Sequence, residues 1–113
     1  MPDKLVVLIA TPHLGEGAEE LGTILMRSFL KTQAKVERRP DTLVLLNEGV
    51  KLAVEGSVVV DDIRALEESG TTVLACGTCL DFYELRDKLA TGTVSNMFDI
   101  VTALNAAGHV IRI

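Results

Sequence analysis

Two patterns of hydrophobic residues alternate along this chain. Short, nearly continuous apolar runs are typical of strands that are covered on both faces of a parallel sheet. Between these runs, apolar residues recur every three or four positions, as on one face of a helix. The expected strands cover residues 4–10, 42–46, 71–75, 93–94 and 109–113. The expected helices cover residues 18–32, 57–68, 81–91 and 95–107.

The alternation of strands and helices predicts the fold class. It indicates an α/β domain, a three-layer α/β/α sandwich around a mostly parallel five-stranded sheet. The length of 113 residues fits a single domain, residues 1–113, without repeats or linkers. Ligands of such sheets bind outside the carboxyl ends of the strands. In this chain those ends carry the segments 11–13, 47–49, 76–79 and 95–97.

The helical segments each present an apolar face. The first helix places these residues on one face: Leu21, Ile24, Leu25, Ser28 and Phe29. In the expected helix 57–68, the side chains expected to point inward are Val60, Ile63 and Leu66. In helix 81–91 they are Phe82, Leu85 and Leu89, and in helix 95–107 they are Met97, Ile100, Val101 and Leu104.

Polar residues and glycines mark where these helices begin and end. Ser57 and Ser95 are expected N-caps, and Asp81 with Glu84 three positions later resembles a capping box. Gly92 is expected to end the third helix. The segment 50–57 fits neither pattern.

Composition excludes several classes of function. The net charge of −5 and the scarcity of aromatic residues argue against binding to nucleic acid. No apolar run approaches the roughly 20 residues that a membrane-spanning helix needs, so no membrane partner is expected. The first residues lead directly into a strand and lack the features of a signal peptide, so a cytoplasmic location is expected.

The chemistry of the chain is concentrated in the motif CGTC at 76–79, which holds both cysteines. Paired thiols in a reducing compartment favour a reactive role over a structural disulfide. Three such roles are open: a persulfide carrier, a dithiol/disulfide redox module, and half of a zinc site. Two small cysteines that merely pack a loop are the alternative without chemistry.

As a carrier, the motif suggests a role for each of its residues. Cys76 is expected to be the nucleophile and Cys79 a resolving or second carrier thiol. The main-chain N–H groups of Gly77 and Thr78, together with a helix beginning near Asp81, are expected to stabilise the thiolate.

Four other polar residues are further candidates, and each has an alternative role. Asn47 either contacts a ligand or stabilises its own turn, and Asn96 either lines the pocket or belongs to a helix cap. His13 either acts as a base or charge partner or is simply solvated. Tyr83 is expected to take part in surface or interface packing.

No metal or cofactor is expected. A zinc site would need both histidines as further ligands, and the direction of the last strand puts His109 at the opposite end of the sheet from Cys76. The glycine-rich segment 15–22 lacks the spacing of a dinucleotide-binding loop, and its acidic residues would repel phosphate.

Several segments together resemble one family. They are Glu20–Gly22, Leu25–Met26, Phe29–Leu30, Leu46–Leu52, Glu55–Ser57, Cys76–Tyr83, Val94–Met97 and Ile100–Val101. In order and nearly over its whole length, the chain resembles the DsrE/DsrF-like family. More specifically, it resembles the C-terminal domain of YedF-type proteins, which are described as sulfurtransferase-like and are linked to selenium metabolism.

The resemblance implies a cytoplasmic sulfur-relay role, with sulfur or selenium carried on the CGTC segment. In the wider family the persulfide cysteine ends the strand, at the position of Cys76, and Cys79 is the additional thiol of YedF-type proteins. The implied partner is a TusA-like sulfur carrier or another sulfur donor or acceptor. The resemblance also implies a homo-oligomer, a trimer or a dimer. The alternatives are the dithiol redox module and a non-catalytic scaffold that binds a TusA-like partner.

Overall fold

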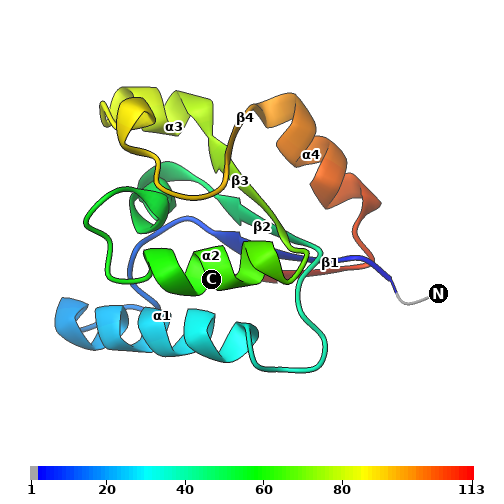
Figure 1. The fold of residues 1–113 in the computed structure, drawn as a ribbon, viewed down its shortest axis with the longest axis horizontal. Coiled ribbons are helices and arrows are strands. Elements are labelled where there is room, and N and C mark those ends of the chain that lie inside the picture. The colour runs from blue at the N-terminus through cyan, green and yellow to red at the C-terminus, as the bar shows by residue number, and fades with distance from the viewer. Residues whose placement is uncertain (1–2) are drawn as a thin grey trace.

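The computed structural model describes residues 3–113 and contains a sheet in which every pair of neighbouring strands is parallel (Figure 1). The sheet has five strands in the order β4-β3-β2-β1-β5. The strands are β1 (Leu5–Ile9), β2 (Thr42–Leu45), β3 (Thr72–Cys76), β4 (Thr93–Ser95) and β5 (His109–Arg112). The predicted five-stranded sheet is therefore confirmed.

Helices lie on both faces of this sheet. They are α1 (Glu19–Gln33), α2 (Val60–Glu68), α3 (Gly77–Phe82) and α4 (Met97–Ala106), with 3₁₀ helices η1 (Asn47–Ala53) and η2 (Arg86–Lys88). From β1 to β4 the chain moves stepwise toward one edge, and α4 then returns it to the opposite edge. Because such crossovers are right-handed, α1 and α2 cover one face and α4 covers the other (Figure 1). The predicted three layers are present.

The core lies between the sheet and its helices. The strands supply continuous buried runs, as expected when both faces of a sheet are covered. The fully buried side chains that α1, α2 and α4 contribute to this core are Met26, Leu30, Ile63, Leu66 and Ile100. No helix within residues 3–113 is long and apolar enough to cross a membrane.

Helix α1 buries a different face from the one that its apolar pattern marks. The side that packs on the protein carries Gly22, Met26 and Leu30, whereas Leu21 and Leu25 are exposed. Gly22 permits this orientation because a Cβ there would lie 2.8 Å from the Cβ of His13. The chain carries two apolar stripes on this helix, and the close approach at Gly22 determines which one is buried.

The third helix is shorter and begins earlier than predicted. It starts at Gly77, directly after β3, and ends at Phe82, so the expected helix over 81–91 is wrong. Asp81 forms no capping box with Glu84; its carboxylate accepts two hydrogen bonds from Arg86, at 2.7 and 3.0 Å. Glu84 has a φ of 56°, which a continuing helix does not allow. Phe82, expected to point inward, is 79% exposed.

The other helix starts also differ. Helix α2 begins at Val60 rather than near Ser57, whose hydroxyl accepts a hydrogen bond from the N–H of Val59 at 3.3 Å. In α4 the N-cap is Asn96 rather than Ser95. Four α4 side chains were expected inside. Of these, Ile100 is fully buried and Leu104 is partly buried, whereas Met97 and Val101 are exposed.

Candidate functional site

Both cysteines lie at the carboxyl end of β3 and are free thiols. Cys76 is the last residue of the strand and the N-cap of α3, and its side chain is 2% exposed. Cys79 lies one turn further, inside α3, and is partly exposed. The motif is therefore the start of a helix rather than the predicted loop, and solvent reaches Cys79 far more readily than Cys76.

Asn47 connects β2 to the exposed thiol. It follows β2 with a φ of 50°, in the left-handed region that asparagine adopts more readily than most residues. Its main-chain N–H donates a hydrogen bond to Sγ of Cys79 at 3.0 Å. Its side-chain Oδ1 accepts a hydrogen bond from Oη of Tyr83 at 2.8 Å. One residue thus fixes the thiol and the neighbouring phenol in relation to each other.

A pocket of about 430 Å³ opens beside this thiol. Its lining residues are Asn47, Thr78, Cys79, Phe82 and Tyr83. The rings of Phe82 and Tyr83 meet edge to face with centroids 5.1 Å apart. Nζ of Lys51 lies 4.5 Å from the centroid of the Tyr83 ring. The pocket therefore presents one sulfur atom among aromatic side chains.

The basic side chains near this region are paired with carboxylates. Nζ of Lys51 lies 2.9 Å from Oε2 of Glu48, and this contact lowers the pKa of the Glu48 carboxyl and raises the pKa of Lys51. The hydrogen bonds from Arg86 similarly lower the pKa of Asp81. Both cations, Lys51 and Arg86, therefore have a carboxylate counter-ion, which weakens their attraction for an anionic ligand.

The surroundings of Cys79 favour its neutral form. Burial raises the pKa of the Cys79 thiol most, and a hydrogen bond with the Cys76 side chain raises it further. The N–H of Asn47 acts in the opposite direction and lowers that pKa. The donor to sulfur is thus the main chain of Asn47 rather than Gly77 or Thr78, and it only partly offsets the other effects.

The remaining predicted residues do not join this pocket. Asn96 uses both polar groups in its own cap: Oδ1 accepts from the N–H of Asp99 at 2.8 Å, and Nδ2 donates to Asp99 Oδ2 at 3.2 Å. Nε2 of His13 lies 3.0 Å from Oε1 of Glu19. His109 begins β5 beside Leu5, at the amino ends of the strands. Within residues 3–113, no three His, Cys, Asp or Glu side chains form a group that could hold a metal ion.

Three residues at or beside the pocket have roles that the sequence analysis did not assign to them. Tyr83, expected only in packing, also lines the pocket and donates its hydroxyl to Asn47 Oδ1. Arg86 covers the start of α3, because a Cβ on Gly77 would lie 2.9 Å from its Nη2. Ser95 pairs with Cys76 across the strands, and its buried Oγ has no hydrogen-bond partner among the described residues. The position of Ser95 near Cys76 could have been expected from the strand order, because Ser95 ends the strand that lies beside β3.

Comparisons with known proteins agree with this architecture. The sequence model of the DsrE/DsrF-like family matches residues 3–113. The crystal structure of the YchN protein from E. coli superposes with a TM-score of 0.73 at 16% identity, covering 97% of this chain and 99% of that one. The structure of the protein of unknown function MTH1491 from Methanobacterium thermoautotrophicum superposes with a TM-score of 0.70 at 20% identity, covering 99% of this chain and 100% of that one.

A third solved structure is also similar, the conserved protein of unknown function BT1422 from Bacteroides thetaiotaomicron. Its TM-score is 0.69 at 19% identity, covering 98% of this chain and 95% of that one. At these identities the structures establish a shared fold. No curated protein matches the chain significantly.

Proposed function

Because the chain belongs to the DsrE/DsrF-like family, we propose that it relays sulfur as a cysteine persulfide on the segment 76–79. The observation that carries this proposal is the environment of Cys79. Its sulfur lies at the wall of an open pocket and accepts a hydrogen bond from a main-chain N–H. Persulfide transfer needs a thiol that a donor can reach, and the burial of Cys76 supports Cys79 as the entry point.

The loading step is a nucleophilic displacement at sulfur. The Cys79 thiolate attacks the outer sulfur of a donor persulfide, R–S–SH, and forms Cys79–S–SH. The donor S–S bond breaks, and the electron pair leaves with the donor as the thiolate R–S⁻. Unloading is the same displacement by an acceptor thiolate. The N–H of Asn47 is placed to stabilise negative charge on the Cys79 sulfur before loading and after release.

A macromolecular donor or acceptor fits this site better than a small anion. The nearby Lys51 and Arg86 are paired with carboxylates, and Phe82 presents a largely exposed ring at the pocket wall. A TusA-like sulfur carrier in the cytoplasm is the partner that we propose. The role of Cys76 is then that of a second thiol. Its thiolate either attacks the outer sulfur of Cys79–S–SH, which forms Cys76–S–SH and releases the Cys79 thiolate, or attacks the inner sulfur, which forms a Cys76–Cys79 disulfide and releases hydrosulfide.

Intact-mass measurement under non-reducing conditions tests the proposal. Reduced protein is incubated with a protein persulfide donor and then freed of the donor. A gain of one sulfur atom, lost after addition of a dithiol reductant, supports the carrier. Loss of only two hydrogen atoms supports the dithiol redox module, and an unchanged mass supports the scaffold.

Two cysteine variants assign the thiols. Cys79→Ser is expected to abolish loading, whereas Cys76→Ser is expected to load at least once per chain. Circular dichroism serves as the folding control, above all for the buried Cys76. Normal loading of Cys79→Ser would instead support Cys76 as the nucleophile.

A further inference from the structure

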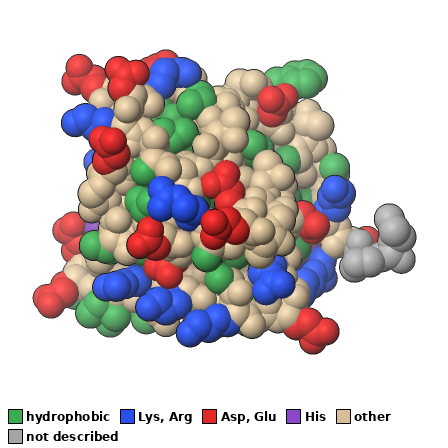
Figure 2. Space-filling view, in the orientation of Figure 1, with side chains coloured by type: hydrophobic (Ala, Val, Ile, Leu, Met, Phe, Trp, Pro, Cys, Tyr) green, Lys and Arg blue, Asp and Glu red, His purple; other side chains and the backbone are tan. Residues whose placement is uncertain are grey.

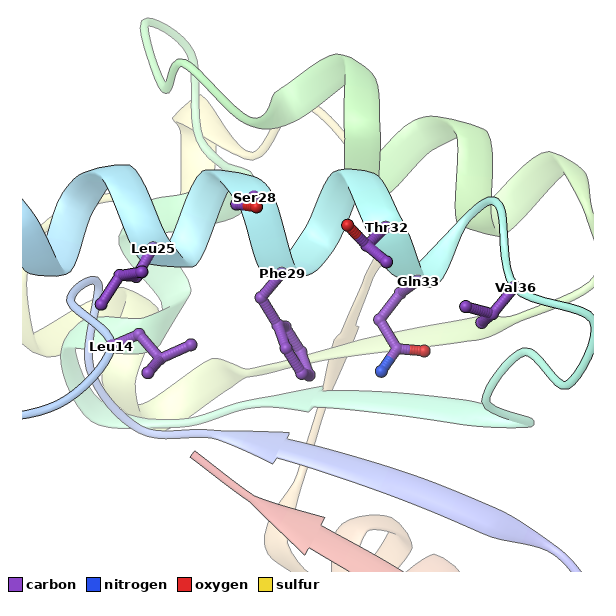
Figure 3. Close-up of a pocket in the computed structure, with 7 residues that line it drawn as sticks. All are labelled: Leu14, Leu25, Ser28, Phe29, Thr32, Gln33 and Val36. Carbon is purple, nitrogen blue, oxygen red and sulfur yellow. The ribbon is translucent and has the colours of Figure 1, made fainter.

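Two hollows of the molecule each have an amide side chain in their wall. The groove beside α1, of about 350 Å³, has Gln33 among the residues labelled in Figure 3. None of those residues is a cysteine, so no side chain in that groove can carry sulfur. The pocket of about 430 Å³ beside α3 has Asn47 and also the thiol of Cys79. Of the two amides, only that of Asn47 therefore lies where transferred sulfur can reach it.

The Asn47 amide has a fixed orientation. Oη of Tyr83 donates a hydrogen bond to Oδ1 of Asn47 at 2.8 Å. The Tyr83 ring is itself held, because Nζ of Lys51 lies 4.5 Å from its centroid and the Phe82 ring meets it edge to face. With Oδ1 occupied by Tyr83, the end of the amide that is left for a ligand is Nδ2.

This Nδ2 is an unused donor at the pocket wall. It carries two N–H bonds, and no hydrogen bond from it to another side chain or to the main chain is found within residues 3–113. Nδ2 of Asn96, in contrast, donates to Asp99 Oδ2 at 3.2 Å. The phenol of Tyr83 has a single proton and uses it on Asn47. The amide, rather than the phenol, is therefore free to donate into the pocket.

The position of Asn47 suits a sulfur atom attached to Cys79. Its main-chain nitrogen lies 3.0 Å from Sγ of Cys79. An S–S bond is about 2 Å long, so the outer sulfur of Cys79–S–SH lies within about 5 Å of that nitrogen. The amide branches from the adjacent Cα of the same residue and is within reach of the outer sulfur. That atom bears the ionisable proton of a persulfide, so it is the atom that becomes negatively charged.

The charged groups near the pocket leave this stabilisation to neutral donors. Lys51 is paired with Glu48, and Arg86 is paired with Asp81. Figure 2 shows acidic and basic side chains next to one another at the corner of the molecule where α3 and η2 lie in Figure 1. With these cations paired, oriented N–H groups are the donors that can stabilise an anion at Cys79.

Resting on the proposed function, we propose that Nδ2 of Asn47 donates a hydrogen bond to the outer sulfur of Cys79–S–SH and of its anion. Asn47 then serves two bonded sulfur atoms with two separate donors, its main-chain N–H for Sγ and its amide for the outer sulfur. Tyr83 is a positioning residue, because its hydroxyl determines which end of the amide remains for the ligand.

The acidity of the persulfide tests this contact. In a Cys76→Ser background, Cys79 reacts with dithiobis(nitrobenzoate) and gives a mixed disulfide and one thionitrobenzoate. Hydrosulfide then attacks the Cys79 sulfur, forms Cys79–S–SH and displaces the second thionitrobenzoate, which is the better leaving group. The released thionitrobenzoate gives the yield, and the near-ultraviolet absorbance of the persulfide anion is titrated against pH.

Three variants in this background separate the donors. Asn47→Gly removes the amide and keeps a main-chain N–H that tolerates the positive φ. It is expected to raise the midpoint by roughly half to one pH unit, as the loss of one hydrogen bond to an anion does. Tyr83→Phe keeps the ring and the amide and is expected to raise the midpoint by less, since the amide is then free to turn. Thr78→Ala changes another polar side chain of the pocket wall and is the matched control, expected to leave the midpoint in place.

The alkylation rate of unloaded Cys79 reports the main-chain contact, and it is expected to stay within twofold of the background in all three variants. Circular dichroism shows whether each is folded; if Asn47→Gly is not, Tyr83→Phe decides. An unchanged midpoint in the deciding variant would overturn the proposal. So would an equal shift in Thr78→Ala, or an equal shift in the titration of the unloaded thiol.

The result does not depend on a carrier protein, because hydrosulfide makes the persulfide. Failure of a protein donor to load Cys79 would overturn the proposed function and leave the measured contact of Asn47 with the outer sulfur in place. The two ion pairs near the pocket are retained in every variant, so they do not contribute to the differences between them.

Discussion

The carboxyl ends of β2 and β3 differ from those of β1 and β4, although all four carry polar residues. At β2 and β3, Asn47 and Cys79 meet across the strand ends and form a pocket. At β1 and β4, His13 contacts Glu19 and Asn96 contacts Asp99, each close to it in the chain. Position at the end of a parallel strand therefore brings polar residues to one edge, but it does not make them act together.

The backbone after the strand makes the difference. Asn47 adopts a left-handed φ, which leaves its N–H free to donate to a sulfur from another element. Asn96 stays extended and uses its side chain to cap α4. Asn47 thus contacts the thiol of the site after β2, whereas Asn96 caps its own helix after β4.

The largest expected effect comes from Gly49, which fixes the Asn47 segment against β1. A Cβ at this position would lie 2.3 Å from the carbonyl oxygen of Ile9. Because backbone atoms must shift to relieve such a contact, Gly49→Ala is expected to destabilise the protein by about 3 kcal/mol. Thermal unfolding is expected at a temperature about 10 °C lower.

Alkylation of Cys79 in the same variant shows whether the site depends on this contact. We expect its rate at fixed pH to change together with stability, because the N–H of Asn47 moves. Thr78→Ala, an exposed change in the same pocket, is the control and is expected to alter neither quantity strongly. Wild-type stability of Gly49→Ala would show that η1 is not held against β1 as the structure has it.

The sheet was predictable from the sequence, and much of the pocket was not. Apolar runs identify strands because burial on both faces removes polar residues locally. The pocket depends on contacts between distant segments, such as Asn47 with Tyr83, which no local pattern encodes. The early start of α3 likewise depends on Gly77, where a side chain would collide with Arg86 and Ser95.

The exposed stripe of α1 shows a second limit of sequence analysis. Periodicity reveals that a helix has an apolar face, but it does not reveal what covers that face. Leu21 and Leu25 follow the helical period as well as Met26 and Leu30 do, yet only the latter pair is buried. Gly22 determines which of the two apolar stripes is buried, because the loop after β1 approaches the helix closely at this residue.

Substitution of the two asparagines compares the two regions directly. Asn47→Ala loses the hydrogen bond to Tyr83 and leaves alanine with a left-handed φ, for a combined loss of about 2 kcal/mol. Asn96→Ala loses only a helix cap, which costs about 1 kcal/mol. Urea unfolding measures both.

The alkylation rate of Cys79 separates the roles of the two asparagines further. It is expected to change in Asn47→Ala and to stay within twofold of wild type in Asn96→Ala. Asn47→Gly, which tolerates the positive φ, is expected to retain the contact between the main chain and Cys79. An equal effect of the two alanine variants on alkylation would remove the distinction between the regions.

The next largest expected effect is a shift in the pH at which Cys79 becomes reactive. Because burial and Cys76 raise its pKa, alkylation by iodoacetamide is expected to have its midpoint above the value of about 8.5 for a free cysteine. Cys76→Ala removes one of these causes and is expected to move the midpoint to lower pH. Thr78→Ala is the control and is expected to leave the midpoint in place.

The same shift predicts the pH dependence of stability. A thiol whose pKa is raised on folding binds its proton more tightly in the folded state. Its contribution to stability is fully present below the unfolded pKa and is lost as the pH rises through the folded pKa. The free energy of unfolding is therefore expected to fall in the alkaline range, less steeply in Cys79→Ser than in wild type.

The smallest effect is expected at His13, in the region that forms no pocket. His13 contacts Glu19 at the protein surface, and such exposed pairs contribute little to stability. His13→Asn is therefore expected to shift the unfolding temperature by no more than about 2 °C. It is also expected to leave the Cys79 alkylation rate within twofold of wild type, since the imidazole does not line the pocket. Glu19→Gln controls for loss of the pair without loss of the ring. A large fall in Cys79 reactivity for His13→Asn but not for Glu19→Gln would show that the histidine serves the thiol after all, and that all the strand ends form one site.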